Sequence, residues 1–336
     1  MKFIDLFSGI GGFRSGLEMN GHECVAFCEI DKYARQSYKA IYNTEGENEY
    51  HDITTITNEE WAKYSGTVDI ITGGFPCQAF SIAGKRGGFS DTRGTLFFDI
   101  ARATEQIKPR FLLLENVKGL LSHDKGKTFA TILSTLDELG YNVEWQVFNS
   151  KDYGVPQNRE RAFIIGHLRG ECGREILSFR RENKTTESKI KVIGNTSLTG
   201  HSSHNVHDVN GISPTIQARD YKGAKQIVVK EATKKGYAIA NPGDSVNISF
   251  PDSETRRGRV GKQIANTLLT NEEQGVVTSD LRIRKLTPLE CWRLQGFTDE
   301  QFYKAKNSGV SDSQLYKQAG NSVTVNVIDE IAKNLF

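Results

Sequence analysis

A cysteine lies where a buried strand is expected to end. The apolar segment Asp69–Thr72 runs into two glycines, and then into Pro76 and Cys77. A cysteine at the carboxyl edge of a strand is within reach of a substrate, and its thiolate is a strong nucleophile. Packing as a small buried side chain is the alternative for Cys77. However, residues 82–95, which follow it, are rich in glycine and basic residues, a composition that favours a mobile lid.

A carboxyl group and two guanidinium groups adjoin other apolar runs. Glu115 comes directly after Phe111–Leu114, a placement that can raise a carboxyl pKa and keep a proton available for acid catalysis. Arg159 and Arg161 alternate, so they lie on the same side of a strand that enters the next apolar run. With Cys77, these side chains indicate chemistry that uses a nucleophile, an acid and cations.

A glycine-rich turn near the start of the sequence indicates a nucleotide-type ligand. Residues 3–13 run from a strand through this turn into a helix, which brings bare backbone close to a ligand. The dinucleotide fingerprint requires a small residue where this chain has Arg14, so an NAD or FAD pocket is disfavoured. Glu29 ends the second strand, where a carboxylate can bind ribose hydroxyls, and Asp52 follows as an adenine partner. An adenosyl ligand fits these features, although the glycines alone also fit a plain tight turn.

The elements that must position these residues show the pattern of a mostly parallel sheet covered by helices. In the first 165 residues, short apolar runs alternate with amphipathic stretches of helix length. From about 170 to 280, polar and turn-forming residues predict a second unit of short strands and loops. Helical character returns at Thr287–Leu294 and Val323–Leu335. The strands predicted for the first unit are Lys2–Leu6, Glu23–Glu29, Val68–Thr72, Phe111–Glu115, Asn142–Asn149 and Ala162–His167.

Length and composition limit the class of protein. The 336 residues suggest two domains, and 37% apolar residues can form a core, which excludes a disordered chain. The 43 basic and 41 acidic residues nearly balance, which argues against a histone-like binder, although residues 167–280 carry 17 basic and 13 acidic residues. No run reaches the roughly 18 to 20 apolar residues of a membrane helix, and no signal peptide is evident. We therefore predict a cytoplasmic location.

Taken in order, these segments resemble the motifs of the DNA (cytosine-5) methyltransferase family. The similarity covers most of the sequence, and residues 180–280, outside it, match the variable target-recognition region of this family. It implies an α/β fold with a Rossmann-like, S-adenosylmethionine-dependent sheet and a smaller recognition domain of strands and loops. The implied catalytic and cofactor-binding domain is 1–180 plus 312–336, and the recognition domain is 181–311. The segments that carry the resemblance are Asp5–Phe13, Gly74–Gln78, Glu115–Val117, Gln157 with Arg159 and Arg161, Arg284–Phe297 and Gly320–Val323.

The resemblance implies methyl transfer from S-adenosylmethionine to C5 of a cytosine that is flipped out of duplex DNA, leaving S-adenosylhomocysteine. Cys77 would add to C6 of the base and Glu115 would supply a proton, while Arg161, with Arg159, would hold the base. The lid from Gln78 to Phe97 would clamp the DNA. The residues that would line the cofactor pocket are Phe7, Gly9, Gly11, Glu29, Ile30, Asp52, Pro76, Leu96, Asn321 and Ser322.

Contacts with DNA are expected from the lid and from the recognition domain. In the family, an arginine-containing loop occupies the position of residues 256–259, and arginine can bond the O6 and N7 atoms of guanine. Contact with phosphates alone is the alternative for these arginines. Ala83 stands in the lid where the family often has serine. The residues expected to contact DNA are Gln78, Ser81, Lys85 and Arg93 in the lid, then Arg256, Arg257 and Arg259, with Arg219 in a rival loop.

The implied chemistry needs no metal, and the cysteines and histidines form no metal-binding pattern. The five cysteines are odd in number and mostly far apart, which predicts free thiols. Cys24 and Cys28 share one face of a strand, as core residues do. His201, His204 and His207 lie in a polar segment, which favours a solvated or DNA-facing loop.

Double-stranded DNA is the implied partner, with action as a monomer and a cognate restriction endonuclease in the same system. A tRNA cytosine-5 methyltransferase shares the catalytic motifs, but its Cys-Phe-Thr signature is absent here. A catalytically silent DNA-binding paralogue is the other alternative, although Cys77, Glu115 and Arg161 are all present. A nicotinamide oxidoreductase is disfavoured, because the dinucleotide fingerprint requires a small residue at the position of Arg14.

Overall fold

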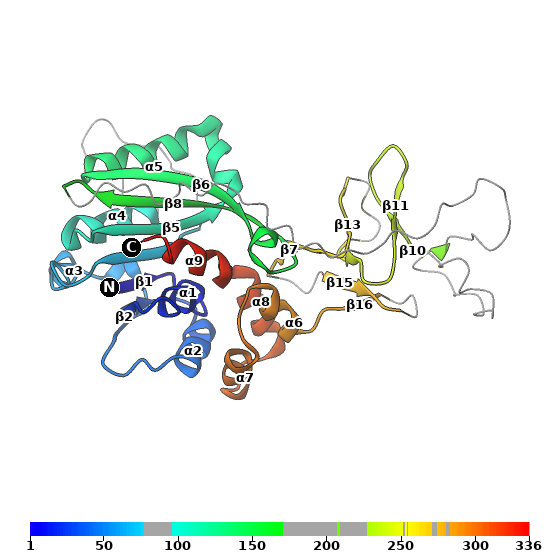
Figure 1. Ribbon diagram of the computed structural model, residues 1–336, viewed down its shortest axis with the longest axis horizontal. Coiled ribbons are helices and arrows are strands. Elements are labelled where there is room, and N and C mark those ends of the chain that lie inside the picture. Colours follow the sequence, from blue (N-terminus) through cyan, green and yellow to red (C-terminus); the bar gives the residue numbers. More distant parts are fainter. Residues whose placement is uncertain are drawn as a thin grey trace.

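The chain folds into a large unit, which holds the central sheet, and a smaller unit of short strands (Figure 1). The two units are joined where β7 (Gln157–Asn158) pairs with β14 (Ala265–Asn266). In the part of the chain that is described, no helix is long and apolar enough to span a membrane. This computed structural model describes residues 1–76, 96–170, 207–208 and 227–335, apart from 251–252, 254, 271–273 and 280–282.

The central sheet is mostly parallel, as the alternating sequence pattern predicts. Its strand order is β3-β2-β1-β4-β5-β8-β6, and β8 runs antiparallel to both neighbours. All the predicted strands are present, whereas the pattern misses β3, because the side chains of that strand are exposed or half-buried. The strands are β1 (Lys2–Leu6), β2 (Glu23–Cys28), β3 (Asn48–Tyr50), β4 (Ile70–Gly74), β5 (Phe111–Val117), β6 (Tyr141–Asn149) and β8 (Glu160–Leu168).

The end of β4 differs from the prediction. The sequence predicts a strand break after Thr72, but Gly73 pairs with Leu114 and Gly74 pairs with Glu115. Space at this position is tight, because a Cβ atom on Gly74 would lie 3.2 Å from Oε2 of Glu115. The glycines therefore continue the strand and bring it close to the Glu115 carboxyl group.

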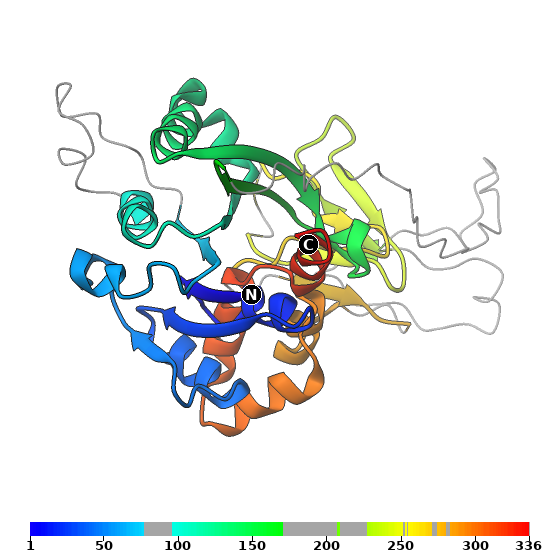
Figure 2. The same ribbon diagram turned by 60° about the vertical axis from the view of Figure 1, so that its left-hand side comes forward.

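Each face of the sheet has its own apolar core, because alternate strand residues point to opposite sides. Ile4 and Ile71 face the core that α3, α4 and α5 cover, whereas Phe3 and Ile70 face the core that α1 and α9 cover. Figure 2 shows α1 beside α9. The helices are α1 (Gly12–Glu18), α3 (Asn58–Ala62), α4 (Leu96–Ile107), α5 (Lys127–Glu138) and α9 (Val325–Ala332).

Helices α1 and α9 are far apart in sequence but approach closely. A Cβ atom on Gly16 would lie 2.6 Å from the Ile328 side chain, and one on Gly12 would lie 2.7 Å from Val323. Asn20 Nδ2 also donates a hydrogen bond of 2.9 Å to the Asp329 carboxylate. The last helix of the chain therefore completes the layer that the first helix begins.

A further core joins α2 to the helices that follow residue 287. Trp292 lies at its centre, with Phe302 and Leu315 beside it. Capping boxes at Thr287 and Thr298 define the starts of α6 and α7. The predicted domain boundary at residue 312 thus falls between helices that share one core. The helices are α2 (Lys32–Ile41), α6 (Pro288–Leu294), α7 (Asp299–Asn307) and α8 (Asp312–Asn321), and 3-10 turns occur at Ile53–Thr55, Lys118–Gly126 and Ser150–Tyr153.

Where it is described, the smaller unit consists of short strands and loops, as its composition predicts. Its sheets have the orders β11-β10-β9 and β13-β12-β15-β16. They share a small core that includes Val229, Val246 and Val277. The strands are β9 (His207–Asp208), β10 (Ile227–Lys230), β11 (Tyr237–Ala240), β12 (Ser245–Asn247), β13 (Val260–Gly261), β15 (Gln274–Val277) and β16 (Ile283–Lys285).

Candidate active site

Glu115 and Arg161 form an ion pair near the end of β5. Nε of Arg161 lies 3.0 Å from Oε1 of Glu115, and the two side chains are only 16% and 13% exposed. Pairing of β5 with β8 sets this arrangement, because Arg161 lies opposite Val117 in the register. Burial raises the pKa of the Glu115 carboxyl group, while the guanidinium groups of Arg161 and Arg159 act in the opposite direction. The site therefore holds an acid that keeps its proton to a higher pH than an exposed glutamate does.

Asn116 holds the end of β4 against β5. Its buried Nδ2 group donates a hydrogen bond of 2.9 Å to the Phe75 carbonyl oxygen, and its Oδ1 atom accepts one of 2.8 Å from the Val117 N–H. The chain is thereby fixed two residues before Cys77. The sequence analysis did not predict this role, although an asparagine directly after Glu115, at the end of an apolar run, could have indicated it.

The predicted nucleophile and lid contacts lie outside the described residues. The described part of the chain ends at Pro76, which is exposed, and begins again at Leu96, the first residue of α4. Because Gly74 is paired with Glu115, the chain enters this segment beside the Glu115–Arg161 ion pair. The site predictions that fall outside are Cys77, Gln78, Ser81, Lys85, Arg93 and Arg219.

Arg159 is buried behind this ion pair and contacts backbone. Its Nη1 group donates to the carbonyl oxygen of Leu268 at 3.1 Å, and its Nη2 group donates to those of Gly320 and Ser322 at 3.0 and 2.8 Å. Burial lowers the pKa of Arg159 to about 9. These Nη donors are engaged with the protein itself, whereas the Nη2 group of Arg161 has no hydrogen-bond partner among the described residues.

The glycine-rich turn leaves open space over Gly9 and is tied to Glu29. A Cβ atom on Gly9 would meet nothing within 4 Å, and this residue has a positive φ of 55°. Its N–H donates a hydrogen bond of 2.8 Å to Oε2 of Glu29, and the Asp31 N–H donates one of 2.8 Å to Oε1. Gly11 differs, because a Cβ atom there would lie 2.3 Å from the Tyr42 ring. Gly9 thus faces open space, while Gly11 makes room for a packed tyrosine.

Of the other residues predicted for the cofactor pocket, four follow the carboxyl ends of β1 to β4, where open α/β sheets bind ligands; they are Phe7, Ile30, Asp52 and Pro76. Ile30 is 71% exposed just after β2. Asp52 caps a 3-10 turn by accepting hydrogen bonds from Thr54, so its carboxylate is partly engaged. Phe7 and Leu96 are half-buried, Pro76 and Asn321 are exposed, and Ser322 is buried against the Gly12 backbone.

If Glu29 binds the cofactor ribose, as the sequence predicts, Glu29→Ala should weaken S-adenosylmethionine binding by about 1.5 to 3 kcal/mol, because a carboxylate that accepts hydrogen bonds from ribose hydroxyls is removed. Equilibrium binding of labelled cofactor measures this change, with thermal unfolding of the free variant as a check on the fold. Glu23→Ala removes an exposed carboxylate from the opposite end of β2 and is the matched control. Unchanged cofactor affinity in Glu29→Ala would contradict the assignment of Glu29 to the cofactor pocket.

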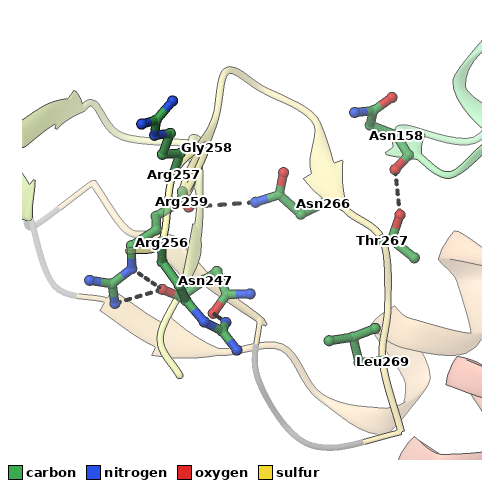
Figure 3. A pocket seen from close by; sticks show the side chains of 9 residues that line it. All are labelled: Asn158, Asn247, Arg256, Arg257, Gly258, Arg259, Asn266, Thr267 and Leu269. Atoms are coloured by element: carbon green, nitrogen blue, oxygen red, sulfur yellow. Dashed lines mark hydrogen bonds between the residues drawn. The ribbon is translucent and has the colours of Figure 1, made fainter. Parts of the chain in front are cut away.

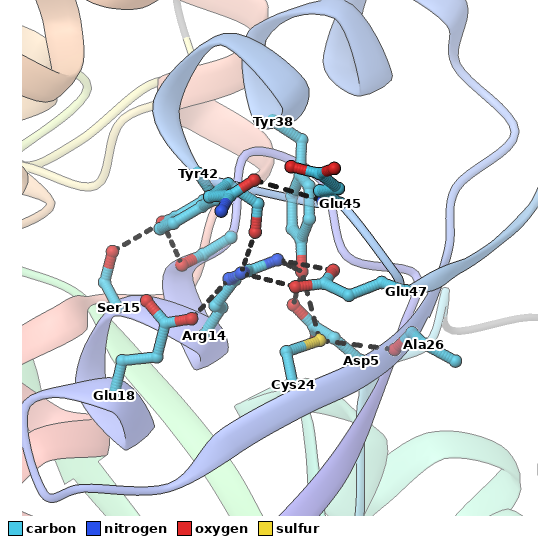
Figure 4. Close-up of polar contacts among 12 residues, drawn as sticks. Asp5, Arg14, Ser15, Glu18, Cys24, Ala26, Tyr38, Tyr42, Glu45 and Glu47 are labelled. Atoms are coloured by element: carbon cyan, nitrogen blue, oxygen red, sulfur yellow. Dashed lines mark hydrogen bonds and ion pairs between the residues drawn. The ribbon is translucent and has the colours of Figure 1, made fainter.

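A buried polar network lies beneath the glycine-rich turn (Figure 4). Asp5 is fully buried and accepts hydrogen bonds from Thr72 at 3.0 Å and Tyr38 at 3.3 Å. Burial raises the pKa of Asp5 to about 7. Arg14, which excludes the dinucleotide fingerprint, binds both oxygens of the Glu47 carboxylate at 2.8 and 2.7 Å. The bulky side chain at position 14 therefore anchors α1 to the loop before β3.

The arginines at positions 256, 257 and 259 lie on one wall of a pocket between the smaller unit and the β7–β14 connection. Arg259 is buried, Arg256 is half-buried and Arg257 is exposed. The pocket has a volume of about 270 Å³. It is lined by Asn158, Asn247, Arg256, Arg257, Gly258, Arg259, Asn266, Thr267 and Leu269.

Comparison with known sequences gives matches along the whole chain. A family model described as C-5 cytosine-specific DNA methylase matches residues 1–336. The type II methyltransferase M.SsoII of Shigella sonnei is 39% identical over 337 residues, covering 99% of this chain and 79% of that protein. M.HpaII of Haemophilus parainfluenzae is 38% identical, with 99% and 88% covered. The orphan methyltransferase M.SPRI of Bacillus phage SPR is 33% identical, with 100% and 97% covered.

Solved structures have the same fold. The S. pombe Dnmt2 methyltransferase superimposes with a TM-score of 0.61 at 18% identity, covering 100% of this chain and 98% of the other. A Spodoptera frugiperda DNMT2 mutant gives 0.58 at 20% identity, with 100% and 99% covered. These likenesses confirm the predicted fold class, and the sequence matches confirm the predicted resemblance. The chain therefore belongs to the C-5 cytosine-specific DNA methylase family.

Proposed function

We propose that this enzyme methylates cytosine through a covalent bond between Cys77 and C6 of a base that has been rotated out of duplex DNA. The observation that carries the proposal is the ion pair of Glu115 and Arg161, which is largely shielded from solvent beside the end of β4. It puts an acid and a cation where the chain leads into Cys77.

The residues fit the chemistry that cytosine requires. C5 is a poor nucleophile until addition at C6 interrupts the aromatic ring. Cys77 as thiolate forms the S–C6 bond, and Glu115, whose pKa is raised by burial, donates a proton to N3 as negative charge develops there. Arg161 holds the base through donors that the protein leaves available. After methylation at C5, the C5 proton is lost to solvent, the S–C6 bond breaks and N3 returns its proton to the Glu115 carboxylate, which restores the ring, the thiolate and the acid.

S-adenosylmethionine is the methyl donor of this family, and the residues near Gly9 fit an adenosyl ligand. When bound, it supplies an electrophilic methyl group. The open space over Gly9 lets a ligand approach the backbone, and the Glu29 carboxylate beside it can accept hydrogen bonds from ribose hydroxyls. We assign Phe7, Ile30, Asp52, Pro76, Leu96, Asn321 and Ser322 to the same pocket.

Rotation of the base is tested with 2-aminopurine, whose fluorescence rises when it leaves the base stack. We expect the emission of a duplex with 2-aminopurine at the target position to rise several-fold on saturation with enzyme, because C6 is inaccessible inside the stack. A duplex labelled outside the recognition sequence is the control. Tight binding with unchanged emission at the target position contradicts base flipping.

The relatives carry two kinds of name. M.SsoII and M.HpaII are named type II methyltransferases, and M.SPRI is named an orphan methyltransferase. We propose that this chain acts on duplex DNA as a monomer, in a restriction-modification system with a cognate endonuclease.

A further inference from the structure

The arginines of the smaller unit differ in what their side chains contact (Figure 3). Arg259 is buried, and its guanidinium donates to the carbonyl oxygen of Asn247 at 3.2 and 3.0 Å and to that of Lys230 at 3.1 Å. Its N–H donates a hydrogen bond of 2.6 Å to the Glu231 carboxylate. Arg259 therefore holds β10, β12 and its own loop together.

Arg256 is also held by the protein. Its Nη1 group donates to Ser249 Oγ at 2.6 Å, and its guanidinium lies 4.7 Å from the centre of the Phe250 ring. Its carbonyl oxygen accepts a hydrogen bond of 2.7 Å from the Ala232 N–H. Half-buried and engaged in this way, Arg256 fixes the loop that carries it.

Arg257, between these two, has no such contacts. It is exposed and makes no hydrogen bond or ion pair with the described residues. Gly258 follows with a positive φ of 65°, and a Cβ atom there would meet nothing within 4 Å, so the chain turns in open space between Arg257 and the buried Arg259. Figure 3 shows the Arg257 side chain pointing away from Asn247, which its neighbours contact.

We propose that Arg257 reads a guanine of the recognised DNA sequence, and that Arg256 and Arg259 hold its loop without contacting bases. This inference rests on the proposed function, since it assigns the sequence reading of the same enzyme. A guanidinium with free donors matches the O6 and N7 acceptors that guanine presents in the major groove.

The surroundings of Arg257 favour a base over a phosphate as its partner. The pocket beside it is lined by the amide side chains of Asn158, Asn247 and Asn266. The Oδ1 atoms of Asn158 and Asn247 accept hydrogen bonds within the protein, so the Nδ2 groups of these two residues are the ones that can match acceptors on base edges. Leu269 is 47% exposed at the same pocket and offers an apolar contact. A phosphate site is expected to bring several free cations together. Among the described residues of this wall, Arg257 is the one arginine whose side-chain donors are free.

The pocket is also fixed relative to the catalytic strands. Asn158, one of its lining residues, directly precedes Arg159 and pairs with Asn266 across β7 and β14. Thr267 Oγ1 donates a hydrogen bond of 2.8 Å to the Asn158 carbonyl oxygen. A guanine bound at Arg257 is therefore held at a set distance from the base held at Arg161, as a fixed recognition sequence requires.

Methylation of duplexes that differ by one base pair around the target tests this proposal. The recognised sequence is first found by bisulfite sequencing of DNA treated with wild-type enzyme. We expect Arg257→Ala to lose about 5- to 150-fold of its preference for guanine at one position, with other positions unchanged. Arg257→Lys keeps the charge but not the two-donor geometry, so it should lose most of that preference too. Lys234→Ala, on the exposed turn between β10 and β11, is the charge-matched control and should keep it.

Other outcomes overturn the assignment. Equal weakening on every duplex, with a salt dependence reduced by about one ion, means that Arg257 contacts a phosphate. Full preference in Arg257→Ala with loss in Arg219→Ala places the reading in the rival loop. If wild-type enzyme methylates DNA at a defined sequence but forms no Cys77 adduct, the proposed mechanism fails while this inference stands.

Discussion

Replacing Cys77 by serine is expected to stop methyl transfer while DNA and cofactor binding remain. A hydroxyl group is a much weaker nucleophile than a thiolate, so the S–C6 bond on which the reaction depends has no equivalent in the variant. We expect the single-turnover rate to fall by roughly 10⁴-fold or more, the scale seen when other enzymes lose their nucleophile. Quench-flow transfer of labelled methyl groups to duplex DNA measures the rate, and equilibrium binding measures retention of both ligands.

A mechanism-based trap identifies the cysteine. Duplex DNA with 5-fluorocytosine at the target position is expected to remain bonded to Cys77, because fluorine cannot leave C5 as a proton does. The buried thiols serve as internal controls, since burial raises the pKa of Cys28 to about 12 and that of Cys24 still higher. An adduct mapped by mass spectrometry to Cys24, Cys172 or Cys291 would rule out the proposed mechanism.

Replacing Glu115 by glutamine is expected to lower the rate of methyl transfer by roughly 10²-fold or more. Glutamine keeps the shape and can hydrogen-bond, but it has no proton to donate as charge develops at N3. The wild-type rate should fall as pH rises through the pKa of Glu115, because the acid form is then lost. Burial moves that fall above the usual range for glutamate. In the variant, this alkaline limb should be absent from the single-turnover pH profile.

Glu160 provides a matched control for this experiment. It is exposed, lies next to Arg161 in sequence and pairs with Lys118 on the surface. Glu160→Gln should retain close to the wild-type rate, and cofactor affinity should be little changed in both variants. A wild-type rate in Glu115→Gln would show that Glu115 has a structural role only.

The elements that position the site were predictable where local pattern decides structure. The apolar runs of β1, β2, β5 and β8 identify buried strands, and the glycines after β1 identify a turn, because both depend on neighbouring residues. The continuation of β4 through Gly73 and Gly74 was not predictable in this way. It depends on pairing with β5, about 40 positions away in the chain.

Side-chain roles that depend on partners distant in sequence could not be predicted either, for the same reason. The side chain of Arg159 contacts Leu268, Gly320 and Ser322, which lie more than 100 positions away, so spacing could not distinguish it from Arg161. Arginines 256, 257 and 259 look alike in sequence, yet burial separates them. Nothing local shows which guanidinium is engaged with backbone carbonyls.

The contact between α1 and α9 has a consequence for how the enzyme is made. A ribosome releases the chain in order at about 5 to 20 residues per second, so α1 waits roughly 15 to 60 seconds before α9 is available. During that interval the apolar residues of this core lack the partners that α9 supplies, and exposed apolar surface of this kind makes an incomplete chain prone to aggregate. A ribosome-bound chain that lacks α9 also lacks the support behind the glycine-rich turn. We therefore expect methylating activity only after α9 has left the ribosome and packed against α1.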